Sequence, residues 1–172
     1  MKLNDYGIII QARMASTRLP GKTLLPLNNG TILDSVISRC SKSICKKIIV
    51  ATSKNMEDDL IEEHCRMKKY NIYRGSNNNV LKRIIDTAKK FKIKKIIRVT
   101  ADNPFVGFDI INYSISFHEK NKKSIPCITD GYSSKLLPNG TVISIFDIKA
   151  LEIIYKKNFN NYKTKEHLIL GL

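Results

Sequence analysis

The chain has 172 residues, an apolar fraction of 42% and a formal net charge of +15 at neutral pH. This length supports one domain with a buried core, and the apolar fraction excludes wholesale disorder. No apolar run approaches the about 20 residues of a membrane-spanning helix, and the amino terminus lacks the apolar core of a signal peptide. We therefore expect a cytoplasmic protein that does not bind membranes.

Strand-like and helix-like segments alternate along the chain. The patterns predict strands at 7–11, 47–52, 71–73 and 95–100, and further β-leaning pieces at 127–129 and 141–146. They predict helices from Thr31 as N-cap and at 56–67, 80–91, 109–118 and 150–155. This alternation implies an α/β fold in which a mostly parallel sheet carries helices on both faces. Ligands bind such sheets at the carboxyl ends of the strands, after Gln11, Thr52 and Thr100.

The loop after the first predicted strand belongs to the stretch "YGIIIQARMASTRLPGKTL" and is rich in cations. It ends in Gly-Lys-Thr, as an ATP-binding P-loop does, but Ser16 stands where that motif needs its first glycine. Pro20 also removes a backbone N–H from a motif that works through such groups. The chain contains no Gly-x-Gly-x-x-Gly either, which argues against a dinucleotide site.

The same loop still has the chemistry of an anion site. Arg13, Arg18 and Lys22 can converge on one polyanion, because guanidinium groups match phosphate oxygens and an ammonium group adds a compact charge. Gly21 allows the backbone to approach a ligand closely. The alternative is an ordinary solvated basic loop.

An acidic residue follows the strand predicted at 95–100. Asp102 suits Mg²⁺, which proteins usually hold with one or two carboxylates together with phosphate oxygens and water. Asp102 can also be read as a turn residue before Asn103 and Pro104. Metal and arginines together would neutralise charge during attack on a phosphate.

Several stretches resemble the cytidylyltransferases that make CMP-activated sugars, most closely the branch with spore-coat polysaccharide biosynthesis proteins. Acylneuraminate and 3-deoxy-manno-octulosonate cytidylyltransferases are relatives of that branch. The resemblance rests on "IIIQARMASTRLPGKTLLPL", "VATSKNMEDDLIEEHC", "YRGSNNNVLKRIIDTAKKF", "IIRVTADNPFV" and "KEHLILGL". It implies a three-layer, Rossmann-like nucleotide-diphospho-sugar transferase fold over a single domain, residues 1–172.

The resemblance also implies CTP and a sugar or sugar-phosphate acceptor as partners, Mg²⁺ as cofactor and a role in surface polysaccharide biosynthesis. It implies catalytic roles for Arg13, Lys22 and Asp102, with Asp102 as the metal ligand. The nucleotide-binding residues that it implies are Gln11, Ala12, Arg18, Gly21, Arg74, Ser76 and Arg83. Asn77, Asn78 and Asn79 can contact the base, or can serve as turn and helix-cap residues.

The chain departs from the family pattern in two places. In "LPNGTVISIF" the family acids are replaced by Asn139, Val142 and Ser144, which leaves the acceptor open. Family members also continue past the Glu-His segment to a second metal-binding aspartate, so we expect a carboxyl-terminal truncation. Asp130 and Asp147 are the remaining candidates for a second ligand. A degenerate relative that binds nucleotide without turning it over is the first alternative function.

The remaining polar residues point to no second site. The four cysteines form no Cys-x-x-Cys pair and are expected to be reduced thiols. His64 and His118 are expected on helix surfaces, and His167 matches a family position without an evident partner.

The net charge suggests a nucleic-acid-binding module as the second alternative function. The lysines are scattered and lack interleaved aromatic residues, however, so we expect no nucleic acid. The oligomeric state stays open, with a homodimer as one option.

Overall fold

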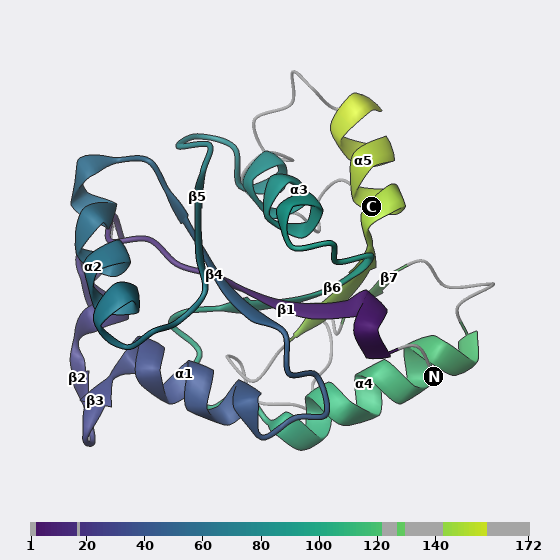
Figure 1. The fold of residues 1–172 in the computed structure, drawn as a ribbon, viewed down its shortest axis with the longest axis horizontal. Coiled ribbons are helices and arrows are strands. Elements are labelled where there is room, and N and C mark those ends of the chain that lie inside the picture. Colours follow the sequence, from purple (N-terminus) through teal and green to yellow (C-terminus); the bar gives the residue numbers. More distant parts are fainter. Residues whose placement is uncertain (1–2, 17, 122–126, 130–142, 158–172) are drawn as a thin grey trace.

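Six strands pair in the order β5-β4-β1-β6-β8-β7 in the computed structural model, which describes residues 3–16, 18–121, 127–129 and 143–157 (Figure 1). The strands are β1 (Tyr6–Gln11), β4 (Ile48–Ser53), β5 (Ile72–Gly75), β6 (Lys95–Thr100), β7 (Cys127–Thr129) and β8 (Ser144–Asp147). Four of them, β5, β4, β1 and β6, run parallel, whereas β8 is antiparallel to both β6 and β7. A separate antiparallel hairpin joins β2 (Pro26–Leu27) to β3 (Gly30–Thr31).

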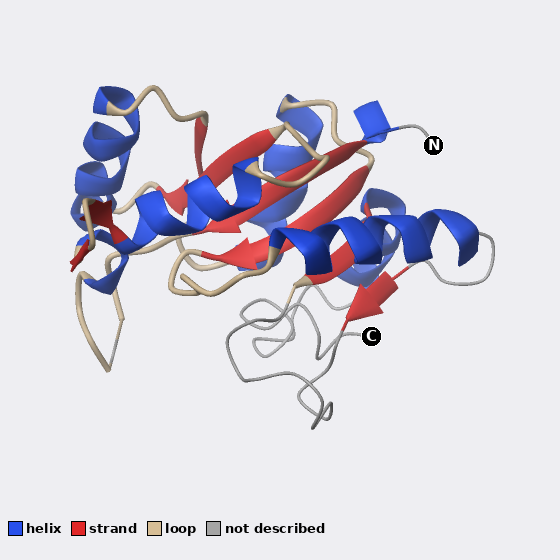
Figure 2. Ribbon diagram, turned by 90° about the horizontal axis from the view of Figure 1, so that it is seen from below, coloured by secondary structure: helices blue, strands red, loops and turns tan. Residues whose placement is uncertain are grey.

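Helices cover both faces of this sheet (Figures 1 and 2). One face packs against α1 (Ile32–Ser41), α2 (Asp59–Met67) and α4 (Phe108–Asn121), and the other against α3 (Val80–Lys90) and α5 (Ile148–Lys157). Three short 3-10 helices complete the described elements: η1 (Leu3–Asp5), η2 (Lys22–Leu24) and η3 (Met56–Asp58). The expected α/β architecture, a mostly parallel sheet between two helical layers, is confirmed.

The apolar pattern of the strands explains the two layers. In β1, Ile8 and Ile10 enter the core under α1, whereas Ile9 enters the core under α3, since alternate side chains of a strand point to opposite faces. A strand that is buried on both sides therefore reads as a continuous apolar run. The Thr31 cap is also confirmed, because its hydroxyl accepts from the Asp34 amide at 3.1 Å while the Asp34 carboxylate accepts from the Thr31 amide at 2.9 Å.

Most predicted elements lie within three residues of their observed bounds, and the strands at 95–100 and 127–129 match them. The segment predicted as one helix at 56–67 begins as η3 before α2 starts, and the short strand predicted at 71–73 is shifted to Ile72–Gly75. The sequence patterns did not reveal the β2–β3 hairpin. Residues 141–142 and the unassigned carboxyl-terminal stretch lie outside the described residues.

The expectation of surface histidines is wrong. His118 on α4 is fully buried, and its Nδ1 lies 2.7 Å from the Tyr6 hydroxyl. The same hydroxyl donates to Glu119, which also accepts from Lys95 at 2.7 Å, so these four residues form a polar cluster at the amino end of the sheet. His64 is half-buried, with its Nε2 2.9 Å from the Asp34 carboxylate, and therefore ties α2 to the start of α1.

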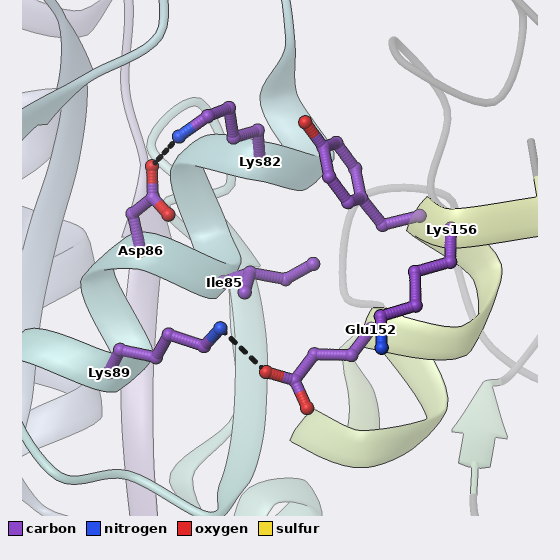
Figure 3. A pocket seen from close by; sticks show the side chains of 7 residues that line it. Lys82, Ile85, Asp86, Lys89, Glu152 and Lys156 are labelled. Atoms are coloured by element: carbon purple, nitrogen blue, oxygen red, sulfur yellow. Dashed lines mark hydrogen bonds and ion pairs between the residues drawn. The ribbon is translucent and has the colours of Figure 1, made fainter. Parts of the chain in front are cut away.

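A hollow between α3 and α5 is lined by Lys82, Ile85, Asp86, Lys89, Glu152, Tyr155 and Lys156 (Figure 3). Two of its lysines face acids of the same hollow, Lys82 with Asp86 and Lys89 with Glu152. Its charges therefore largely compensate one another.

No described helix is long and apolar enough to cross a membrane.

Three cysteines of the described residues are buried. Cys40, Cys45 and Cys65 are free thiols, and burial raises the pKa of Cys40 and of Cys65 to about 12. These thiols are therefore protonated at neutral pH and behave as small apolar side chains.

Candidate active site

The carboxyl ends of the four parallel strands meet at one edge of the sheet (Figure 1). The strand register places Gln11 of β1 beside Ala51 of β4 and Thr100 of β6, and Ser53 of β4 beside Gly75 of β5. The loops that follow these strands therefore share this edge. Nine of the ten site residues expected from the sequence lie at the ends of these strands or in the loops that follow them. The tenth, Arg83, lies in the first turn of α3.

Residues 12–22 are here called the basic loop, and hydrogen bonds hold the two ends of this loop together. The Gly21 amide donates to the Met14 carbonyl at 2.9 Å, and the Thr23 hydroxyl donates to the Arg13 carbonyl at 3.1 Å. Gly21 has a φ of 73°, a left-handed conformation that favours glycine. At its start the loop continues the sheet, because the buried Ala12 donates its amide to the Ala51 carbonyl. Arg13 and Arg18 are exposed on this loop.

Lys22 and Asp102 are brought into direct contact, with the Lys22 ammonium donating to the Asp102 carboxylate. Burial is the largest influence on the pKa of Asp102 and raises it, but hydrogen bonds from Lys22 and Thr100 outweigh burial and leave this pKa below its ordinary value. The carboxylate is therefore ionised at neutral pH. Its side chain remains 35% exposed, so a ligand can reach it.

Gln11 is oriented by an arginine from the neighbouring strand. Arg98 of β6 donates to the Gln11 Oε1 atom from both Nε and Nη2, at 3.0 and 2.9 Å. Because the amide oxygen is occupied by these two donors, the Gln11 NH₂ group is left to serve as the donor toward a ligand. Arg98 was not among the residues expected from the sequence.

Arg74 is held by protein groups on all three guanidinium nitrogens. Its Nε and Nη2 donate to the carbonyls of Ser53 and Asn55 at 2.9 and 2.8 Å, and Nη1 contacts the carboxylates of Asp59 and Glu62 at 2.5 and 2.8 Å. These contacts tie β5 to α2. The structure therefore places Arg74 near the edge but directs its donors inward.

Arg83 and Ser76 lie together on the other side of the same edge. Arg83 is only 1% exposed, and its Nη1 donates to the Ser76 carbonyl at 2.7 Å. Burial lowers the pKa of Arg83, the negative charge of Asp58 opposes this effect, and the positive charge of Arg13 adds to it. The charges of the basic loop thus act on Arg83.

The asparagines beside Ser76 have structural partners. Asn79 caps α3 by accepting from the Lys82 amide at 2.8 Å, and Asn77 accepts from the Lys54 amide at 2.8 Å. The helix-cap and turn readings therefore hold for these two residues. Asn78 is exposed.

One acid at this edge was missed from the sequence. Asp58 is 1% exposed and accepts hydrogen bonds from the amides of Met14 and Ser53 and from the Ser53 hydroxyl. In "KNMEDDL" it reads as one of several acids in the first turn of a helix, where the helix dipole explains them. Only the fold reveals that its carboxylate contacts the basic loop.

Neither candidate for a second metal ligand, Asp130 or Asp147, is found beside Asp102 among the described residues. Asp147 is wrong as a partner of Asp102, because the register of β8 on β6 places it opposite Lys95 at the amino end of β6, roughly 17 Å of strand away from the carboxyl end. Ser144 is buried beside Arg98 in the sheet. Asp130, Asn139, Val142 and His167 lie outside the described residues, as does Thr17 of the basic loop. Within the described ranges, no group of three or more histidines, cysteines or acids could hold a metal.

Comparisons with known proteins give relatives over most of the chain. A family model described as cytidylyltransferase matches residues 7–170. Spore coat polysaccharide biosynthesis protein SpsF of Bacillus subtilis (strain 168) is 34% identical over 168 residues, which cover 93% of this chain and 70% of SpsF. A 3-deoxy-manno-octulosonate cytidylyltransferase of Wigglesworthia glossinidia brevipalpis is 25% identical over 185 residues, with 96% of this chain and 72% of the relative covered.

A solved structure extends the likeness to three dimensions. A cytidylyltransferase from Leptospira borgpetersenii serovar Hardjo-bovis (strain JB197) superposes with a TM-score of 0.90 at 32% identity, covering 96% of this chain and 69% of that one. The fold is thus shared over nearly the whole chain.

Proposed function

The chain belongs to the cytidylyltransferase family, and on that premise we propose that it transfers CMP from CTP to a sugar or sugar-like acceptor and releases pyrophosphate. The observation that carries this proposal is the contact between Lys22 and Asp102, which joins the basic loop to the end of β6. A cation that can hold a triphosphate and a carboxylate that can hold a metal thus meet at one point.

The basic loop supplies the charge that this reaction requires. Arg13, Arg18 and Lys22 would hold the phosphates, and Gly21 lets the backbone approach them. Negative charge that builds up on the α-phosphate and on the leaving pyrophosphate would be stabilised by these fixed cations. Since the loop is closed by its own hydrogen bonds, little reorganisation is needed at the moment of reaction.

Gln11, Ala12, Ser76 and Arg83 would form the nucleoside side of the site. Gln11 presents a donor because Arg98 occupies its oxygen. Arg83 holds the Ser76 carbonyl and would shape the loop around the base rather than contact it, since its side chain is buried. We assign Arg74 a supporting role of the same kind, because its three nitrogens are bonded to protein.

The residues present fit a magnesium ion that is shared with the ligand. Asp102 is ionised and reachable, and Mg²⁺ is commonly held by one or two carboxylates with phosphate oxygens and waters completing the set. When bound there, the ion would add positive charge next to the phosphates. The sugar acceptor and a role in surface polysaccharide synthesis are part of the proposal through the likeness to SpsF.

Calorimetry with CTP and Mg²⁺ tests the binding half of the proposal, and pyrophosphate release with a panel of sugar acceptors tests the transfer half. We expect CTP to bind more tightly than other nucleotides, and Lys22→Ala and Asp102→Ala to weaken its binding. Lys54→Ala, an exposed lysine at the same edge, serves as the control for a general loss of charge. Binding without turnover would favour the degenerate relative, and no nucleotide binding at all would contradict the proposal.

A further inference from the structure

The buried carboxylate of Asp58 has unusual hydrogen-bond partners for its position in the chain. Asp58 occupies the N-cap position of α2, where an aspartate normally accepts from the amides of its own helix. Here its side chain makes no capping bond to α2. The carboxylate instead bonds to groups outside its helix, so a helix-capping role does not explain why an acid is buried at this position.

The two oxygens of Asp58 connect the basic loop to β4. Oδ1 accepts from the Met14 amide at 2.7 Å, and Oδ2 accepts from the Ser53 hydroxyl and amide at 2.5 and 3.1 Å. Hydrogen bonds to a carboxylate are about twice as strong as those between neutral groups. Asp58 thus fastens the start of the basic loop to the end of β4.

The fastened residue is the one that closes the loop. Met14 follows Arg13 directly, and its carbonyl accepts from the Gly21 amide, the residue before Lys22. A shift of Met14 would therefore displace Arg13 and Lys22 together. The Asp58 side chain controls both cations through one backbone group, although Arg13 and Lys22 stand far apart along the loop.

Charge supports the same role. Asp58 offsets the effect of burial on the pKa of Arg83, whereas Arg13 reinforces it, so the negative charge of Asp58 acts between two arginines that would otherwise repel each other. Burial is the largest influence on the pKa of Asp58 and raises it, but bonds from Ser53 and Met14 outweigh burial and keep this pKa below its ordinary value. Asp58 is therefore charged at neutral pH.

We infer that Asp58 is a positioning residue that holds the basic loop in its polyphosphate-binding conformation before the ligand arrives. It carries no contact to the reacting atoms in this scheme. The ligand class is a polyphosphate, and its identity as CTP rests on the proposed function.

The test compares Asp58→Asn with Glu57→Gln, an exposed acid one position earlier that loses the same charge. The side-chain amide introduced by Asp58→Asn cannot accept from both Met14 and Ser53, since one of its two positions is now a donor. In the free protein, tryptic cleavage after Arg13, Arg18 and Lys22 should become roughly tenfold faster in Asp58→Asn, and the Met14 amide should exchange faster. Affinity for inorganic triphosphate should fall by about tenfold. Glu57→Gln should behave as the wild type.

A milder change covers the case in which Asp58→Asn does not fold. Ser53→Ala removes the hydroxyl donor to Asp58 but leaves both backbone donors, and should raise loop cleavage by about threefold. Wild-type cleavage and triphosphate affinity in Asp58→Asn, or in Ser53→Ala where the first variant is unfolded, would overturn the inference. The two proposals can fail separately. If Asp58→Asn opens the loop but the wild-type protein does not bind CTP, only the cytidylyltransferase reaction is refuted. If the wild-type protein binds CTP but Asp58→Asn leaves the loop unaltered, only the positioning role is refuted.

Discussion

Strand β6 carries a lysine–carboxylate pair at each of its ends, and the two pairs differ in almost every respect. At the amino end, Lys95 and Glu119 are each 14% exposed, and Glu119 also accepts from the Tyr6 hydroxyl. At the carboxyl end, Asp102 is 35% exposed and its partner Lys22 belongs to a loop. The first pair is enclosed and shared with neighbours, whereas the second is open to a ligand. An ion pair alone therefore does not mark an active site, and its surroundings decide its role.

The sharpest test of this difference is Asp102→Asn. We expect activity, measured as pyrophosphate release, to fall by at least ~100-fold, because the fixed charge proposed to hold the metal is lost. The free energy of unfolding should change by less than about 1 kcal/mol, since a partly exposed pair contributes little to stability. A large loss of stability in denaturant titrations would place Asp102 with the structural pair instead.

The reverse outcome is expected for Lys95→Met. Removing the cation leaves the charge of Glu119, which is only 14% exposed, beside Tyr6 without the Lys95 ammonium, and this should cost about 3 kcal/mol in urea denaturation. CTP affinity and turnover should remain close to wild type in the folded fraction. Lys94→Met provides the matched control, because Lys94 pairs with Asp5 while 72% exposed and should cost at most about 0.5 kcal/mol. Equal effects of the two changes would contradict the contrast.

Arg74→Met sharpens the same contrast within the carboxyl edge. The change removes contacts with Asp59, Glu62 and two carbonyls, so we expect a loss of about 1–2 kcal/mol in stability. Calorimetry should show CTP affinity lowered by no more than about threefold. A loss of more than about tenfold would mean that Arg74 turns outward and contacts the nucleotide.

The smallest expected effect concerns Asp34, an acid between α1 and α2. Its pKa is raised by burial, the largest influence, but bonds from Thr31, His64 and Tyr70 outweigh burial and lower the pKa overall. Because the folded-state pKa lies below the unfolded value of about 4, the contribution of Asp34 to stability is present above that pH and is lost as pH falls through the folded pKa. In a pH series of urea titrations, the free energy of unfolding of Asp34→Asn should therefore fall less on the acid side than that of the wild type. The difference should be less than about 1 kcal/mol. Glu63→Gln, an exposed acid of α2, should retain the wild-type slope.

The sequence predicted the framework of the sheet better than the partners of its charged groups. The strand at 95–100 was placed correctly because its apolar run is bounded by lysines and a turn, which are local signals. The β2–β3 hairpin escaped because two-residue strands have no periodicity to detect. His118 was misjudged for a different reason, since its partner Tyr6 lies 112 residues away in the chain.

The candidate site shows the same limit. Lys22, Asp102 and Gly21 could be named from their positions after predicted strands, where ligands bind α/β sheets. The roles of Arg74 and Arg83 could not, because Glu62, Asp59 and the Ser76 carbonyl become their partners only after the helices pack. Asp58 and Arg98 were invisible for the same reason, since each acts on a loop or strand distant in sequence.

The place of β1 in the sheet has a consequence for how the chain folds. β1 is made early but lies between β4 and β6, and its Gln11 bonds to Arg98, 87 residues later. Pairings of such long range must overcome a large loop-closure entropy, so they form slowly. During synthesis, β1 and its isoleucines must wait for β6 to leave the ribosome before both sheet neighbours are available. We therefore expect nascent chains that end before β6 to expose one unpaired edge of the apolar strand β1 and to depend on chaperones.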